Sequence, residues 1–170
     1  MDSKQGLKEL YLHELQDAYS AETQITQALP KVIDAVSDLK LKKALTDHLD
    51  QTKKHKEIIS ELASSQGGSP GGEKCDGMAG LLKEGSKIIE EFEAGPVRDA
   101  ALIGACQKVE HYEISAYGTL KVFADHLDRH DDVTRLDEIL QQEFEADELL
   151  SEIAESAVNW KAAEEPSASK

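Results

Sequence analysis

The sequence predicts an all-α protein, a bundle of four long helices with a short fifth helix in the crossover between its two halves. Apolar residues recur at alternating steps of four and three through four long segments, which is the spacing of a helix-packing seam. Pro and Gly gather in a few short stretches between those segments. Clusters of Val, Ile and aromatic residues with a period of two, which would indicate strands, are absent from the sequence.

The breaks between the segments set the expected helix boundaries. The Gly- and Ser-rich stretch SSQGGSPGGEKCDG predicts the longest loop, at 64–78. Shorter breaks follow at VSDLK, where Ser37 or Asp38 can cap a new helix, and at EAGPVRD, where Pro96 suits a first turn. A further break, DRHDD, lies near residue 130. We therefore expect helices, the third of them short, at residues 5–36, 39–64, 79–94, 97–128 and 132–161.

Pro30 lies inside the first expected helix, where its ring and missing N–H should kink the helix or end it early. The apolar stripe continues on both sides of Pro30, so we predict one helix through this position. A single domain is expected over residues 1–162. Residues 163–170, which include EEPSASK, are expected to form a flexible tail.

The composition excludes several classes of partner. The chain of 170 residues carries 34 acidic residues against 19 Lys and Arg, a formal net charge of −15. A surface this acidic repels phosphate backbones, so nucleic acid is not expected as a partner. No apolar run approaches the roughly 18 residues of a membrane span, and the N-terminus lacks a signal-peptide core. We expect no membrane partner and a cytoplasmic location. Cys75 and Cys106 fit no zinc-ligand spacing and are expected to be reduced thiols.

Each long seam is interrupted by polar residues that face inward. In the last helix the other acids fall on the opposite, solvated side at about 100° per residue, so the inward ones are not a by-product of composition. In the first helix a single acid breaks the seam. The interrupting acids and histidines, in chain order, are Glu22, His48, His55, Glu110, Glu113, Glu143 and Asp147.

These interruptions lie at similar distances along the chain from the connecting turns, so an antiparallel bundle gathers them in one central layer between apolar layers. Burying several unpaired carboxylates there is very costly. Lys and Arg are missing from the seams, apart from Lys121 at an edge. The acids are therefore either protonated or met by cations. Two divalent ions nearly balance five carboxylates, and oxygen and nitrogen ligands of this kind suit iron or manganese.

Each candidate metal ligand, taken alone, has a more ordinary explanation. The prediction of a metal site rests on the convergence of many inward polar residues in one layer. A lone pair of acids at helical spacing is usually a solvated face, and a seam histidine is more often a satisfied core residue than a ligand. Of the two histidines we include His55 and not His48. Tyr117 is expected to pack in the core, where its hydroxyl can hydrogen-bond a ligand. The carboxylate candidates are Glu22, Glu110, Glu113, Glu143 and Asp147.

Three stretches, LHELQDAYSAETQITQALPK, KCDGMAGLLKEG and VRDAALIGACQKVEHYEISAYGTL, resemble the bacterial YciE/YciF-type stress proteins of the ferritin-like superfamily. The resemblance covers nearly the whole chain except the tail, and the third stretch is highly specific. It implies a ferritin-like four-helix bundle with a dinuclear metal centre, commonly a homodimer, induced under stress. It also implies that Pro30 is tolerated within the first helix or at a bend in it.

The resemblance carries over to individual residues. It matches Glu22 in SAE, Glu110 and Glu113 in VEHYE, and Glu143 and Asp147 in EFEAD to the acidic ligands of the family. The second helix departs from the pattern, because relatives often have a glutamate in HLEET where this chain reads HLDQT. Gln51 occupies that place. Its neutral carbonyl can still bind a metal, or His55 can take over, so we include both as candidate ligands and expect an asymmetric or weakened site.

Two functions from different classes remain open. The first is redox chemistry at a dimetal centre, with dioxygen or peroxide as the small substrate. Iron would make the protein an oxidase or ferroxidase, and manganese would make it catalase-like. The leading ligands would then be Glu22, Glu113 and Glu143. The alternative is a non-catalytic, stress-induced dimer whose metals are structural or buffered, with the short helix at the dimer contact. Iron storage in a cage and DNA protection are less favoured, because nothing indicates cage assembly and the tail carries little positive charge.

Overall fold

The computed structural model describes residues 6–164, which contain helices and no strand. The expected all-α fold is confirmed. None of the helices in this range is long and apolar enough to cross a membrane. The elements in chain order are α1 (Leu7–Ala35), α2 (Leu39–Ser65), α3 (Asp76–Glu91), α4 (Pro96–His126), α5 (His130–Ile153), a π-helical turn (Ala154–Val158) and α6 (Asn159–Glu164).

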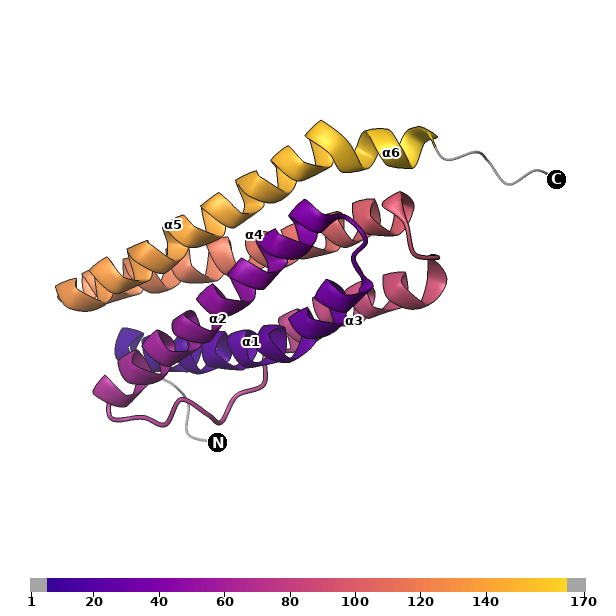
Figure 1. The fold of residues 1–170 in the computed structure, drawn as a ribbon. Helices are drawn as coiled ribbons and strands as arrows, with labels where there is room; N and C mark the ends of the chain where they lie inside the picture. The colour runs from indigo at the N-terminus through magenta and orange to yellow at the C-terminus, as the bar shows by residue number, and fades with distance from the viewer. Residues whose placement is uncertain (1–5, 165–170) are drawn as a thin grey trace.

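The long helices form two hairpins that pack into a bundle. Helix α1 pairs with α2 and α4 pairs with α5, while α1 also contacts α4 and α2 contacts α5. Figure 1 shows the two hairpins and the loop that leads from α2 into the crossover. The short helix α3 lies in that crossover and packs on α1 and α4. This is the four-helix arrangement with a fifth helix in the crossover that the sequence predicts.

The helix boundaries follow the predicted breaks closely. Pro30 lies inside α1, which continues to Ala35, so the prediction of one helix through this proline is confirmed. The last helix begins at His130, two residues before the expected start. It continues through the π-helical turn and α6 to Glu164, so the first two residues of the expected tail are helical. The rest of that tail lies outside the residues described.

The turn between α1 and α2 is built from side-chain caps. Asp38 caps α2, because its Oδ1 accepts hydrogen bonds from Lys40 N at 2.9 Å and from Leu41 N at 3.2 Å. This satisfies two of the N–H groups that a helix start leaves unpaired. Lys161 of α6 donates to the other Asp38 oxygen at 2.9 Å, which ties the end of the chain to the same turn.

A buried aspartate fastens this turn to α4. Asp99 is 1 % exposed, and its carboxylate accepts from Ser37 N at 3.0 Å and from Asp38 N at 2.8 Å. The neighbouring Arg98 donates to the Ala35 carbonyl oxygen at the end of α1. The VRD stretch therefore closes one end of the bundle through backbone groups that would otherwise be unpaired.

The opposite end has a comparable arrangement. Asp132, in the first turn of α5, is buried and accepts from the Tyr11 hydroxyl of α1 at 3.0 Å. Arg129 Nε donates to the same oxygen of Asp132 at 2.6 Å. A carboxylate that accepts charged and neutral donors together is well compensated for its burial, so α1 and α5 are joined at this end.

Two apolar clusters fill the bundle, one toward each end, as the sequence predicts. Between them lies a layer of buried polar side chains drawn from all four long helices. The cluster near the Asp99 end includes Leu29, Leu41, Leu45, Leu102 and Leu150. The cluster near the Asp132 end includes Leu15, Ile59, Leu62, Leu120 and Leu136.

We predict that Asp99→Ala lowers the free energy of unfolding by about 1–3 kcal/mol, because it removes the hydrogen bonds that a buried, charged carboxylate accepts from the backbone of the α1–α2 turn. Chemical denaturation of the two proteins measures this difference. Asp125→Ala, an exposed aspartate on the same helix, is the matched control and should change stability by no more than about 0.5 kcal/mol. Equal effects of the two substitutions would contradict the role given to Asp99.

Candidate metal centre

Six side chains form the polar layer, and each is no more than 5 % exposed. Helix α1 contributes one acid, α2 contributes two histidines, α4 two acids and α5 one acid. Each lies on the inward seam of its helix, so the helical period that buries the leucines also buries these groups. Water cannot solvate charges at this depth, and their partners must come from the protein or from a bound ion. The residues are Glu22, His48, His55, Glu110, Glu113 and Glu143.

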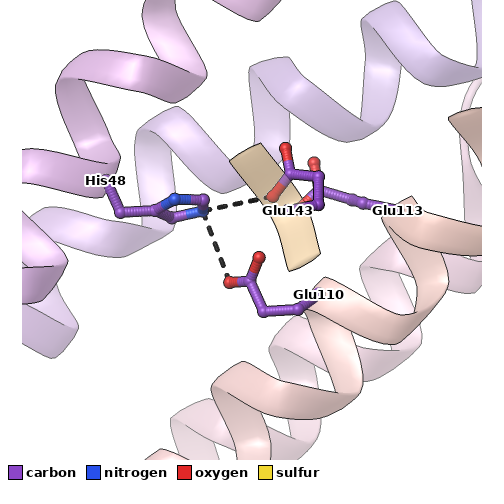
Figure 2. Close-up of side chains that lie close together, drawn as sticks. All are labelled: His48, Glu110, Glu113 and Glu143. Carbon is purple, nitrogen blue, oxygen red and sulfur yellow. Dashed lines mark ion pairs between the residues drawn. The ribbon is translucent and has the colours of Figure 1, made fainter. Parts of the chain in front are cut away.

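The six residues divide into two groups that share one member. In the first group, ligand atoms of His48, Glu110, Glu113 and Glu143 all lie within 4.8 Å of one another. In the second, atoms of Glu22, His55 and Glu143 meet the same condition. Figure 2 shows the four side chains of the first group pointing toward a common centre. Each group can hold a metal ion, and the shared Glu143 lies between them.

The two histidines face the carboxylates at short range. His48 Nε2 lies 3.3 Å from Glu110 Oε1 and 3.9 Å from Glu143 Oε2. His55 Nδ1 lies 2.9 Å from Glu143 Oε1 and 3.6 Å from Glu22 Oε1. None of these contacts has the geometry of a hydrogen bond. The groups are close without being satisfied by one another.

A glutamine fixes the ring of each histidine. Gln51 Oε1 lies 3.4 Å from His48 Nδ1, and Gln142 Oε1 lies 2.9 Å from His55 Nε2. An amide oxygen can only accept, so the ring nitrogen that faces it carries the proton. The other nitrogen of each neutral ring then presents a lone pair to the carboxylates. This is the arrangement that orients metal-binding histidines in proteins.

The unpaired atoms of the structure converge on this layer. Among residues 6–164, the buried side-chain nitrogen and oxygen atoms without a hydrogen-bond partner all belong to it, with one exception, Arg98 Nε. Native proteins leave few such atoms, and a cluster of them calls for a bound ion or water. The unpaired donor set is carboxylate oxygen and imidazole nitrogen, which fits a divalent transition metal. The atoms are Glu22 Oε2, His48 Nε2, His55 Nδ1, Glu110 Oε2, Glu113 Oε2 and both Glu143 oxygens.

Without bound metal, the surroundings of the layer favour the protonated forms of most of its carboxyl and imidazole groups. Burial, together with the charge of Glu143, raises the pKa of Glu110 and of Glu113 well above the usual range. Burial also raises the pKa of Glu22, against the opposing effect of His55. Burial alone would lower the pKa of His55, but pairing with Glu143 and Glu22 raises it to about 10. Burial works against the charge of Glu143, yet the His55 ring beside it lowers its pKa.

A buried phenol completes one side of the layer. Tyr117, on α4, donates its hydroxyl hydrogen to Glu22 Oε1, and this is the hydrogen bond to a ligand that the sequence anticipates. Its ring packs edge-on against His55, with the ring centroids 6.3 Å apart. Burial and the neighbouring carboxylates raise the pKa of Tyr117 well above its ordinary value, so the phenol keeps its proton.

Asp147 lies apart from the layer. Its side chain is 23 % exposed, one oxygen lies 3.0 Å from His111 Nε2, and the other accepts from Gln107 Nε2 at 3.1 Å. Asp147 is one helical turn beyond Glu143 on α5, and α4 binds its carboxylate at the surface. The structure therefore brings five of the expected ligands together and places Gln51 behind His48 rather than among the carboxylates.

Two residues of the site are not predicted from the sequence. His48 belongs to the first group although we treated it as a core histidine, and its signal is its place on the same seam as His55, two turns away. Gln142 precedes Glu143 directly, and no local pattern marks it as the partner of a histidine on another helix.

The fold and this layer define the class of protein: a four-helix bundle whose centre holds a buried histidine–glutamate cluster able to hold metal. The chain belongs to the family described as Domain of unknown function (DUF892), whose pattern matches residues 6–163. The family resemblance inferred from the sequence is thus confirmed.

Individual relatives cover the same range. The chain is 41 % identical to Protein YciF of Escherichia coli over 157 residues, which is 92 % of this chain and 95 % of the relative. The crystal structure of that E. coli stress protein matches with a TM-score of 0.87 over 92 % of this chain and 99 % of the other. YcfI of Rhodopseudomonas palustris matches at 39 % identity with a TM-score of 0.84, over 88 % and 96 %. A protein from Xanthomonas campestris at 24 % identity, TM-score 0.78, shares the fold over 94 % and 99 %.

The raised pKa values predict how metal-free stability depends on pH. Protonated Glu110 and Glu113 stabilise the folded state below their unfolded pKa near 4.5, and this stability is lost as the pH rises toward their folded values. His55 acts in the same direction between its ordinary 6.5 and about 10. The thermal midpoint of chelator-treated protein should therefore fall steadily from about pH 5 to pH 10, and Glu110→Gln/Glu113→Gln should flatten the lower part. A midpoint that rises with pH would contradict this electrostatic description.

Proposed function

We propose that this chain is a dinuclear metal protein of the YciF type that holds two divalent ions, iron or manganese, and reacts with dioxygen or peroxide. His48, Glu110 and Glu113 would hold one ion and Glu22 and His55 the other, with Glu143, which belongs to both groups, available to each. Bound metal would supply Lewis acidity and electrons to an oxygen substrate. We assign no ligand role to Asp147, because its oxygens are engaged by α4, and Gln51 acts through the ring of His48.

One observation supports this proposal above the others: the unpaired buried atoms are carboxylate oxygens and imidazole nitrogens, and they face the same small space. Four acids and two histidines give a donor set that suits iron and manganese. With two divalent ions the four carboxylates are neutralised, and the histidines can be neutral ligands. No Lys or Arg lies among the buried residues of the layer to do this instead.

The chain's own residues have separate tasks around such a centre. Gln51 and Gln142 hold the two imidazoles in the tautomers that bind metal. Tyr117 holds Glu22 in place and keeps a proton within reach of the second group. The apolar clusters above and below keep water from the two ends of the layer, which strengthens the electrostatic interactions inside it.

A structural role for the metals is the second candidate. The carboxylates of the layer are costly to bury, so ions that neutralise them would stabilise the fold whether or not they do chemistry. Under this proposal the protein is a homodimer in which the metals serve folding or metal buffering. The apolar Phe92, just past α3, is 41 % exposed and Val97 of α4 is 38 % exposed, which supports a contact near the short helix.

We predict that purified protein binds two Fe²⁺ or Mn²⁺ ions per chain and that His48→Leu and His55→Leu each lose one, because each histidine belongs to a different group. Anaerobic titration followed by metal analysis gives the stoichiometry. Asp147→Asn is the control and should keep both ions. Loss of an ion in Asp147→Asn would show that Asp147 is a ligand. Two bound ions in both histidine variants would overturn the assignment of His48 and His55 as ligands.

The redox and structural functions are separated by admitting oxygen to the loaded protein. Ferrous protein prepared without air should develop a ferric absorption band in the near ultraviolet on exposure to air, and manganese-loaded protein should release dioxygen from peroxide if it is catalase-like. Glu143→Gln should abolish the response, because it removes the shared ligand, while Asp147→Asn should retain it. Two bound metals with no response to either oxidant would favour the structural function.

A further inference from the structure

A largely apolar cavity lies under α3 and ends at the metal layer. Its volume is about 100 Å³. Leu81 and Ile89 of α3 form its outer wall, while Ile25 of α1 and Val109 of α4 line its inner part. At its mouth lie the exposed residues Lys31 and Ser86. Its polar end consists of two residues of the first ligand group, His48 and Glu110.

A second cavity reaches the same two residues from the opposite direction and has a different chemistry. It lies between α2 and α5, has a volume of about 220 Å³, and is lined by Asp47, Gln51 and Glu145 as well as by apolar residues. A hydrated cation or a polar molecule such as peroxide finds hydrogen-bond partners there. The cavity under α3 offers such partners at its two ends, and between them the Cys106 thiol is the one other polar side chain in its lining.

The size and lining of the α3 cavity restrict its occupant. Pockets that bind drug-sized ligands are about 300–1,000 Å³, so a cavity of about 100 Å³ takes a molecule of only a few atoms. Small cavities lined by Leu and Ile stay dry and bind nonpolar guests such as xenon. Of the two small substrates considered for this centre, peroxide is polar, whereas dioxygen is uncharged, apolar and small enough for this cavity.

The helix that covers this cavity is only partly buried. Met78 is the only buried residue of α3, and the others that face the cavity are half-buried or exposed. Gly85 of α3 comes close to α4, since a methyl group added to it would lie 3.8 Å from the Ala105 Cβ. Because α3 approaches α4 this closely, a guest enters instead at the mouth between Lys31 of α1 and Ser86 of α3, which does not open the four-helix core.

We propose that the cavity under α3 binds dioxygen and delivers it to the His48 and Glu110 side of the metal layer. The binding half of this inference stands on the cavity alone. The delivery half rests on the proposed function.

Xenon tests the binding half on the full chain without any metal. Crystals pressurised with xenon should show it in this cavity, and Ala105→Leu and Ala28→Leu, which add bulk from α4 and α1, should both lose it. Ala146→Leu, which adds the same bulk to the polar cavity between α2 and α5, is the matched control and should keep the xenon. Ordered water in place of xenon would overturn the inference.

Dissolved dioxygen gives a direct second measurement. Under dioxygen pressure its paramagnetism should broaden the methyl resonances of Leu81 and Val109 in the metal-free protein. The methyl resonances of Ile59 and Leu136, in the other apolar cluster, should change far less. Uniform broadening in both sets would overturn binding at this cavity. In Ala105→Leu the broadening of the Leu81 and Val109 resonances should be lost, and this can be measured in solution even if the larger side chain shifts α3.

The delivery half is tested on ferrous protein mixed with dissolved dioxygen. Ala105→Leu and Ala28→Leu should slow the appearance of the ferric band relative to Ala146→Leu, with unchanged metal stoichiometry. Xenon binding with unaltered rates would overturn delivery and leave the proposed function intact. A chain that binds xenon but no metal would overturn the proposed function, and delivery with it, while the binding site would stand.

Discussion

The cost of placing carboxylates out of reach of water governs the middle of this bundle. Glu22 and Glu143 have no exposed surface, and Glu110 and Glu113 have almost none. No Lys or Arg among the buried residues described compensates them. The two histidines are close but misaligned for hydrogen bonding. A fold that tolerates this must gain its stability elsewhere, and the apolar clusters on either side and the capped turns at both ends are where it does so.

The polar layer also accounts for the two glutamines that contact the outer nitrogens of its histidine rings. Each imidazole has an amide on one nitrogen and carboxylates on the other. Gln51 is neutral, and a neutral side chain in contact with a histidine ring avoids adding a further charge to a crowded site. Gln51 thus contacts the ring of His48 from behind, while the carboxylates face the centre.

Much of this could be predicted from the sequence, because helical period and hairpin connectivity together decide which residues meet. Glu22 and Glu143 share a layer since each interrupts an apolar seam at a similar distance from a turn. Asp147 shows the limit of that reasoning: one turn past Glu143 it still appears inward on a helical wheel, yet α4 supplies His111 and Gln107 at the edge and holds it there. The position of His48 on its own helix does not identify it as a ligand, because the carboxylates that its ring faces lie on neighbouring helices. The π-helical turn after Ile153 has no Pro or Gly to announce it.

The hydrogen bonds of Asp99 and Asp132 at the two ends of the bundle fix how far each helix is shifted along the bundle axis relative to its neighbours. One residue of slippage between paired helices moves a side chain by about 1.5 Å along the axis and turns it by about a quarter revolution, whereas coordination distances tolerate only about 0.2 Å. Asp99 ties the α1–α2 turn to α4, and Asp132 ties α1 to α5. Neither aspartate touches the polar layer. Together, however, they fix the axial positions of the helices, so that the histidines and glutamates of the layer stay at the same height in the bundle.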